Sequence, residues 1–273
     1  MSTPPPRWQP TAGWQAGRVM KTAAPLLFLG WAVLVFSGRA NDLLFGDGPG
    51  PDRFLVLVGG IAVIALVSAV LTAVAAKRRR TAFTRLAAER GWRYQATDTR
   101  DLPRRWSWEP FGQGSSRRAS DVLHGEHAGY RFAAFHYRYV TGSGDDRRTH
   151  LIGVIALRLP AALPRIEVSP EGLIGSIAPG LVRTDIDLES EDFNRRYRVS
   201  CADRKFAVDI LTPRTVEALL SVRPFRWRID GSDLIAIDAA TESPAAVLDR
   251  VAVLAGVAAG IPSFVWKDRG RSA

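Results

Sequence analysis

Histidines are the side chains of this sequence best suited to metal chemistry, and all four lie between positions 124 and 150: His124, His127, His136 and His150. The first two belong to a His-Gly-Glu-His segment that we expect to form a turn, so they lack the one-face helical geometry of a zinc protease motif. The other two lie on the strands of an expected hairpin and would share a face if residues 140 and 148 pair. A metal site needs three or four of them to converge. Ordinary strand and turn histidines are therefore the favoured interpretation, and we predict no metal and no cofactor.

The remaining reactive side chains give little evidence of catalysis. Asp185, Asp187, Glu189 and Glu191 alternate, so their carboxylates would line one face of an extended strand. A hard cation is one interpretation, but the segment lacks the glycine and terminal glutamate of a calcium-binding loop, which favours a solvated strand face. The single cysteine, Cys201, is expected in the core. The sequence contains no nucleophile elbow, phosphate-binding loop or dinucleotide motif, and we assign no catalytic residue.

Two apolar segments in the first third of the chain would anchor the rest of the protein at a membrane. Residues 54–76 carry no charge and would form a helix about 35 Å long, enough to cross a hydrocarbon core of about 30 Å. Residues 22–38 are shorter, about 26 Å as a helix, and a cleaved signal peptide is the alternative for them. We predict a two-span α-helical membrane hairpin made of residues 22–38 and 54–76.

The distribution of charge predicts the orientation of this hairpin. Lys77, Arg78, Arg79 and Arg80 follow the second apolar segment directly, whereas the loop of residues 39–53 holds two arginines and three aspartates. Because positive charge stays inside, we expect a multi-pass protein of the plasma membrane with both termini in the cytoplasm. Residues 1–21 are rich in proline and are predicted to form a disordered cytoplasmic tail, and residues 39–53 a short external loop.

The net charge of +10 raises the question of nucleic-acid binding, but six of these charges arise before residue 81, from nine basic and three acidic residues. Elsewhere the arginines are interleaved with acidic residues, so we predict no nucleic-acid partner. The basic cluster of residues 77–80 faces the lipid headgroups in our interpretation, although a topology signal alone explains it too. Ala65, Ala69 and Ala73 form a row of small residues for helix packing, either within the hairpin or in a homo-oligomer.

The rest of the chain, residues 77–273, predicts one cytoplasmic α+β domain with a mainly antiparallel sheet. A short helical pattern ends at Gly91, and a strand begins at Trp92. Further strands are expected at residues 119–124, 130–140, 148–159, 165–168, 184–188, 197–201, 225–230 and 234–238, the last two turning at residues 231–232. Helical patterns fall at residues 215–222 and 243–259. Charged residues inside the last helix disfavour a third membrane span.

One segment has the pattern of a known family. From Asp187 it reads Asp-Leu-Glu-Ser-Glu-Asp-Phe-Asn-Arg-Arg-Tyr-Arg-Val-Ser-Cys, and it continues to Thr212-Pro213. It resembles a bacterial, actinobacterial-type family of membrane-anchored domains of unknown function. Six positions carry the match: Glu189, Phe193, Val199, Ala207, Leu211 and Pro213. The resemblance implies two N-terminal spans and a cytoplasmic α+β domain. It implies no activity and no catalytic residues.

These patterns favour a non-catalytic binding or scaffolding module on the cytoplasmic face of the membrane. Its partners would be the lipid bilayer and an unidentified protein. One alternative is a membrane-anchored enzyme that uses the region of His124 and His127. The other is an oligomeric transport component, for which the spans offer no intramembrane charge.

Overall fold

The computed structural model describes residues 52–171, 186, 188–239 and 243–270. By its internal contacts the chain divides into two compact units, Met1–Arg78 and Arg79–Ala273. The second contains the whole sheet and is called the sheet unit below. The first predicted span, residues 22–38, lies outside the described residues, as do the predicted tail and most of the external loop.

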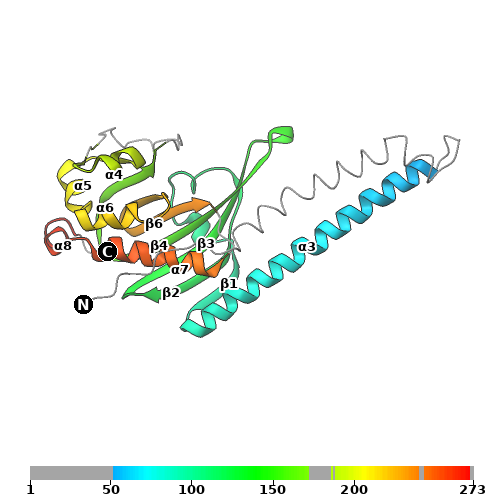
Figure 1. The fold of residues 1–273 in the computed structure, drawn as a ribbon, viewed down its shortest axis with the longest axis horizontal. Coiled ribbons are helices and arrows are strands. Elements are labelled where there is room, and N and C mark those ends of the chain that lie inside the picture. The colour runs from blue at the N-terminus through cyan, green and yellow to red at the C-terminus, as the bar shows by residue number, and fades with distance from the viewer. Residues whose placement is uncertain (1–51, 172–185, 187, 240–242, 271–273) are drawn as a thin grey trace. The chain divides into compact units, whose positions relative to one another are not determined.

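Helix α3 (Asp52–Arg90) contains the second predicted span (Figure 1). Within the described residues, one unbroken helical segment is long and apolar enough to cross a membrane, and it is Gly59–Arg90 of α3. Its most apolar window has a mean hydropathy of 2.3. None of that window is buried within the described part of the protein. Val63 is 60% exposed and Leu66 is 65% exposed. By its length and composition this helix is suited to cross a bilayer.

The last turns of α3 belong to the sheet unit and are buried there through Phe83, Leu86 and Ala87. The helix ends at Gly91, whose φ of +67° is the left-handed conformation typical of a helix C-terminus. The amide of Trp92 donates to the carbonyl of Ala87 at 2.8 Å, which satisfies one of the last free carbonyls of the helix. The expected end of the helix is confirmed, and the first strand begins two residues after Gly91.

Six antiparallel strands form one sheet, which confirms the expected α+β class with an antiparallel sheet. The strands are β1 (Arg93–Asp98), β2 (Ser115–His127), β3 (Tyr130–Thr141), β4 (Arg148–Pro170), β5 (Tyr197–Cys201) and β6 (Arg226–Ala239). Their order is β1-β2-β3-β4-β5, and β6 also pairs with β4. β3 pairs with the first half of β4 and β5 with its last residues, while β6 pairs along both halves.

Two expectations about β4 and β6 were wrong. The strand expected at residues 165–168 continues β4, which runs through Pro160 and Pro164 with register shifts between residues 158 and 166. The turn expected at residues 231–232 is absent, because β6 is one strand in which Gly231 (φ +60°) lies opposite Leu163. A glycine permits a register shift inside a strand as well as a turn between two strands, and the local sequence does not distinguish the two.

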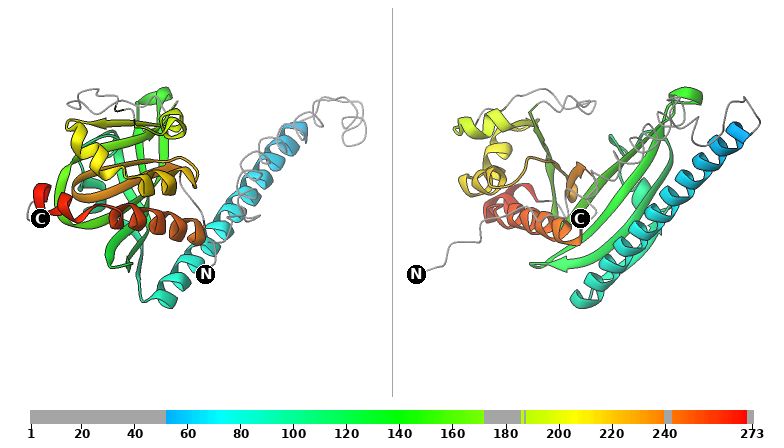
Figure 2. Two further views of the ribbon diagram at one scale, coloured as in Figure 1. Left: turned by 60° about the vertical axis from the view of Figure 1, so that its left-hand side comes forward. Right: turned by 45° about the vertical axis from the view of Figure 1, so that its right-hand side comes forward.

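Five shorter helices follow β4: α4 (Glu191–Arg196), α5 (Arg204–Ile210), α6 (Pro213–Leu220), α7 (Pro244–Ala259) and α8 (Ser263–Arg269). They lie together at one side of the sheet (Figure 2). The larger core cluster lies between these helices and the sheet, with Trp227 and Leu254 fully buried. α7 and α8 are apolar when taken together, but they meet at an angle of 72°, and α7 buries Val251 in this core.

A smaller core cluster covers other residues of the sheet. The connection between β1 and β2, which includes the 3-10 helix η1 (Leu102–Arg104), supplies Trp106 and Phe111 to it. These side chains pack against Phe135 and Tyr137 of β3. Core on each side of a sheet buries successive residues of its central strands, and β3 is accordingly buried almost throughout.

Candidate functional site

Three side chains converge on the carboxylate of Asp121, where α3 enters the sheet unit. A guanidinium nitrogen (Nη2) of Arg79 lies 3.0 Å from Oδ2. The hydroxyl of Tyr94 donates to Oδ1 at 2.8 Å. The Nδ1 atom of His136 lies 3.4 Å from Oδ2. We call these four residues the Asp121 cluster, and it joins α3 to strands β1, β2 and β3.

A β-bulge directs Asp121 into this position. The register between β2 and β3 shifts between Ser120 and Leu123, and Asp121 has a φ of +51°. Asp tolerates the left-handed region better than most residues because its short side chain can hydrogen-bond locally. A bulge bends the strand and re-aims a side chain. Here it places a carboxylate in a strand whose neighbours Val122 and Leu123 are fully buried.

The cluster is buried and electrostatically balanced. Asp121 is 3% exposed and His136 is 5% exposed. Burial raises the pKa of Asp121, but hydrogen bonds from His136 and Tyr94 and the charge of Arg79 outweigh it and hold the pKa below its ordinary value. Burial and the hydrogen bond to Asp121 raise the pKa of Tyr94 to about 12. The carboxylate is therefore ionised and the phenol protonated at neutral pH.

With these partners the Asp121 cluster serves to fix α3 to the sheet. Asp121 has protein contacts at both of its oxygens, and the edge of Phe83 packs on the ring of His136 with centroids 6.4 Å apart. A carboxylate saturated in this way is poorly placed to act as a base or a metal ligand. The geometry instead connects the helix predicted to span the membrane with three strands of the sheet.

In the basic cluster predicted at residues 77–80, one residue forms an ion pair within the protein and three are exposed. Arg79 has a protein partner, since it pairs with Asp121. Lys77, Arg78 and Arg80 are exposed, so contact with lipid headgroups stays a prediction for these three. The predicted packing residues Ala65, Ala69 and Ala73 are also exposed on α3, and their packing partner stays a prediction.

The four candidate histidines are spread over both faces of the sheet. His124 and His127 lie in strand β2 and not in the expected turn, which falls at Ala128 and Gly129 (φ +51° and +81°). His150 pairs with Tyr139, whereas His136 pairs with Gly153. His136 and His150 therefore lie on opposite faces, because the register differs from the expected one and side chains alternate. Within the described ranges, no three His, Cys, Asp or Glu side chains are arranged to hold a metal ion.

The other chemical candidates have structural surroundings where they are described. Cys201 is fully buried, and its Sγ lies 3.3 Å from the carbonyl oxygen of Arg165 and 3.2 Å from that of Asp203, so its single S–H has two possible acceptors. Burial raises the pKa of this thiol. Asp185 and Asp187 lie outside the described residues. Glu191 opens α4, so the expected strand face of alternating carboxylates does not extend to it.

Two further groups of buried charges were missed by sequence reasoning. Asp233 accepts hydrogen bonds from Arg105 at 3.0 and 2.8 Å and from the indole of Trp106 at 3.1 Å. In the sequence, both groups appear only as charged residues that alternate with apolar residues along a strand, as in residues 226–230.

The second group surrounds Glu167 on β4. Arg226 approaches it to 2.8 Å without hydrogen-bond geometry, and Arg228 lies 3.5 Å away. Arg228 is fully buried with its guanidinium 4.1 Å from the ring of Trp108. Burial lowers the pKa of Arg228. Among the described residues, no nitrogen of this guanidinium has a hydrogen-bond partner, so packing on the indole replaces hydrogen bonding as its main contact.

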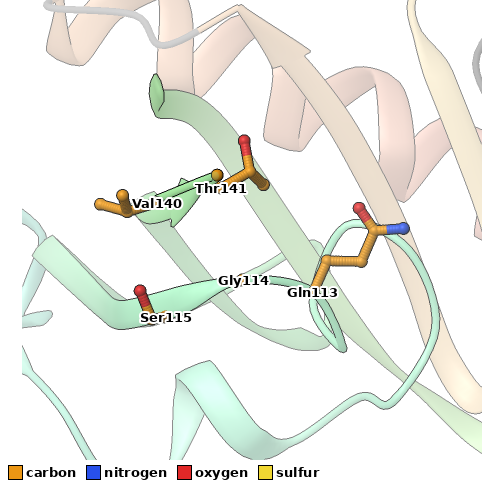
Figure 3. Close-up of a pocket in the computed structure, with 6 residues that line it drawn as sticks. Gln113, Gly114, Ser115, Val140 and Thr141 are labelled. Atoms are coloured by element: carbon orange, nitrogen blue, oxygen red, sulfur yellow. The ribbon is translucent and has the colours of Figure 1, made fainter. Parts of the chain in front are cut away.

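A shallow pocket of about 500 Å³ lies where the start of β2 meets the end of β3. Its lining is mostly main chain and small side chains, from residues 113–115 and 140–142 (Figure 3). A Cβ atom at Gly114 would lie 2.3 Å from the carbonyl oxygen of Val140. The pocket thus arises from a close approach of two backbones, and it contains no titratable side chain.

Comparison with known proteins places the fold and not the activity. No family model matches the chain, and no curated protein matches it. The family resemblance drawn from residues 187–213 therefore remains a prediction. Among solved structures, the crystal structure of the mycobacterial trehalose monomycolate transport factor A, TtfA, matches with a TM-score of 0.50 and 16% identity. The match covers 68% of this chain and 93% of that one, so the two share a fold.

Proposed function

We propose that the chain is a membrane-anchored accessory factor whose sheet unit binds a protein partner at the cytoplasmic face. The observation that carries this proposal is the course of α3. Its apolar part is uncovered by the described protein, and the same helix continues into the sheet unit, where the Asp121 cluster and Phe83 hold it. A domain built onto its own anchor in this way suits a protein that acts at a membrane.

The fold likeness supports the accessory role. TtfA is named a trehalose monomycolate transport factor, and a supporting role of that kind is what we propose for this chain. A shared fold does not carry a substrate from one protein to the other. We therefore propose the class, an accessory factor of transport, and leave its cargo to experiment.

The anchor is proposed to contain two spans, residues 22–38 and 54–76, with both termini in the cytoplasm. A cytoplasm-active reporter fused after Ala273 and a periplasm-active reporter placed within residues 46–51 should both give signal. A C-terminal reporter active only outside the cytoplasm would contradict this topology.

Partner capture tests the function itself. The tagged full chain is purified from its native membrane in mild detergent beside a variant whose residues 54–76 are replaced by an unrelated apolar span. We expect the same membrane protein to co-purify with both chains, because the sheet unit is the proposed binder. A partner lost with the replaced span would assign the binding to the helix, and would favour the oligomeric transport component.

Metal analysis of the same purified chain addresses the enzyme alternative. Stoichiometric zinc or manganese that is lost in His127→Ala but kept in His150→Ala would contradict a non-catalytic module and assign a metal site to the region of His124 and His127.

A further inference from the structure

We propose that Arg80, with Arg118 and Arg138 of neighbouring strands, binds the headgroups of anionic phospholipids, and that Leu151 is an apolar contact beside Arg138. This site lies in the sheet unit and is additional to the chain's membrane anchor. It rests on the proposal that α3 spans a bilayer. The occupant we propose is the lipid of that same bilayer.

Three of these residues form one row across the sheet. Arg118 of β2 is the direct cross-strand partner of Arg138 of β3, and Arg138 is in turn the partner of Leu151 of β4. Direct partners project from the same face, with Cβ atoms about 5 Å apart. Two guanidinium groups in this relationship repel one another, so the pair opposes folding unless an anion lies between them. Leu151 is 47% exposed, which is unusual for a leucine in a central strand.

The arginines have no counter-ion in the described part of the protein. No ion pair or side-chain hydrogen bond found there involves Arg80, Arg118 or Arg138. Asp121, the buried carboxylate of this face, is occupied by Arg79, Tyr94 and His136. The charge of the row is therefore available to an external anion.

The row is connected to the predicted span by short steps along the chain and by the contacts of the Asp121 cluster. Arg138 lies two residues from His136 on one face of β3, about 7 Å along the strand. His136 belongs to the Asp121 cluster, which also holds Arg79. Arg79 follows the end of the uncharged run at Ala76 by three residues, about 4.5 Å along a helix. Arg80 comes next, and its charge acts on the Tyr94 hydroxyl of the same cluster.

Anionic lipid explains both the charge and the leucine. Arginine binds phosphate with two parallel hydrogen bonds, and a basic residue near an anionic membrane surface contributes about fivefold in affinity. A nucleic acid would leave Leu151 exposed, whereas the interface of a bilayer accommodates it beside the arginines. The acidic residues interleaved elsewhere in the sequence also disfavour a nucleic-acid surface.

The experiment measures headgroup contact in the full chain. Thr149, an exposed residue two positions from Leu151, is replaced by Cys and labelled with a fluorophore, while the buried Cys201 stays unlabelled. The protein is placed in nanodiscs of phosphatidylcholine, with or without phosphatidylglycerol, that carry a quencher on the lipid headgroup. We expect stronger quenching in the discs that contain phosphatidylglycerol, and weaker quenching as salt rises.

The variant Arg118→Ser with Arg138→Ser should reduce the equilibrium constant for headgroup contact in anionic discs about 30-fold, and the remaining preference for anionic discs would come from Arg80. The control Arg204→Ser with Arg214→Ser removes the same charge from exposed positions of α5 and α6 and should leave quenching unchanged. Thermal melts confirm that both variants are folded. Equal losses in the two variants, or no response to phosphatidylglycerol in the parent, would overturn the proposal.

Competition separates lipid from a soluble phosphate. Millimolar glycerol phosphate, compared with chloride at equal ionic strength, should not displace the lipid, because the bilayer presents many headgroups at once. Displacement would instead assign a small-molecule phosphate site. Retention of the chain in carbonate-washed membranes tests the anchor separately, so failure of the headgroup site is distinguishable from failure of the anchor.

Discussion

Arg79 and Asp121 form an ion pair of 3.0 Å between α3 and the bulge of β2, with the Asp121 side chain 2% exposed and that of Arg79 28% exposed. The pair connects the basic cluster at the end of the apolar helix with the buried polar group of the sheet. It therefore gives one arginine of that cluster a structural role.

Loss of the Arg79 side chain should destabilise the sheet unit, whereas loss of its neighbour should not. We expect Arg79→Gln to lower the free energy of unfolding by about 2 kcal/mol, because Asp121 then remains buried with only His136 and Tyr94 as partners. Arg78→Gln, at an exposed position, should change it by less than about 0.5 kcal/mol. Urea unfolding followed by tryptophan fluorescence in detergent measures both, and equal effects would contradict the structural role of the pair.

The same carboxylate should contribute to stability in a pH-dependent way. Its pKa is lower in the folded protein than the ordinary 3.8, so the ionised form favours folding. This contribution is complete above the unfolded pKa of about 4 and is lost as pH falls through the folded value. The difference in melting temperature between the parent and Asp121→Asn should therefore shrink as pH falls from about 6 to about 3. Asp145→Asn, in the exposed turn between β3 and β4, serves as the control and should show no such trend.

The buried arginine of β6 should be dispensable, but the carboxylate beside it should not. Arg228→Met removes a desolvated cation and leaves Glu167 paired with Arg226, so we expect a change between zero and about 2 kcal/mol of added stability. Glu167→Met leaves two arginines buried together and should cost about 3 kcal/mol. Chemical unfolding of both variants is the measurement. A greater loss in Arg228→Met than in Glu167→Met would show that the guanidinium is needed for the fold.

Alanine substitutions at Gly129 and Gly114, two glycines with positive φ, distinguish the cost of backbone strain from the cost of steric overlap. At Gly129 (φ +81°) an added Cβ atom meets nothing within 4 Å, whereas at Gly114 (φ +67°) it would lie 2.3 Å from the carbonyl oxygen of Val140. Gly129→Ala should cost about 1 kcal/mol. Gly114→Ala should cost about 3 kcal/mol or more, because two strands must also separate. Similar melting temperatures for the two variants would mean that the strands yield easily at the pocket.

Cys201 should be inert until the sheet unit unfolds. The side chain is fully buried, and burial raises its pKa, which leaves little thiolate at neutral pH. We expect modification by a maleimide at a rate limited by unfolding, and fast modification of an added cysteine at Thr149. Rapid labelling of Cys201 in the native protein would contradict its position in the core.

Local signals predicted many elements of the sheet unit. Gly91 marked the end of α3, the polar run of residues 141–147 marked the β3–β4 hairpin, and Ser243-Pro244 marked the start of α7. The helix predicted at residues 215–222 is α6, which begins two residues earlier at Pro213. Each of these signals acts within a few residues. The continuity of β4 and β6 depends instead on pairing between segments about 70 residues apart, which the prolines and Gly231 conceal.

The Asp121 cluster could not be predicted for the same reason. Its four members come from four elements and meet only because a bulge turns Asp121. The available signal was a lone carboxylate in the apolar run of residues 119–123, since a buried charge requires a partner. The prediction that His136 and His150 share a face was wrong because β3 and β4 pair one residue away from the expected register. A shift of one residue moves a side chain to the other face of the sheet.

The long strand β4 also determines when the protein can finish folding. β6, which pairs along both halves of β4, lies about 70 residues further along the chain, so the sheet cannot close until that later segment has been synthesised. Pairing over such sequence separations is slow. The apolar helix leaves the ribosome long before that point. If α3 is the proposed membrane anchor, the sheet unit completes its fold after the anchor has formed, and β4 exposes one unpaired edge until β6 has been synthesised.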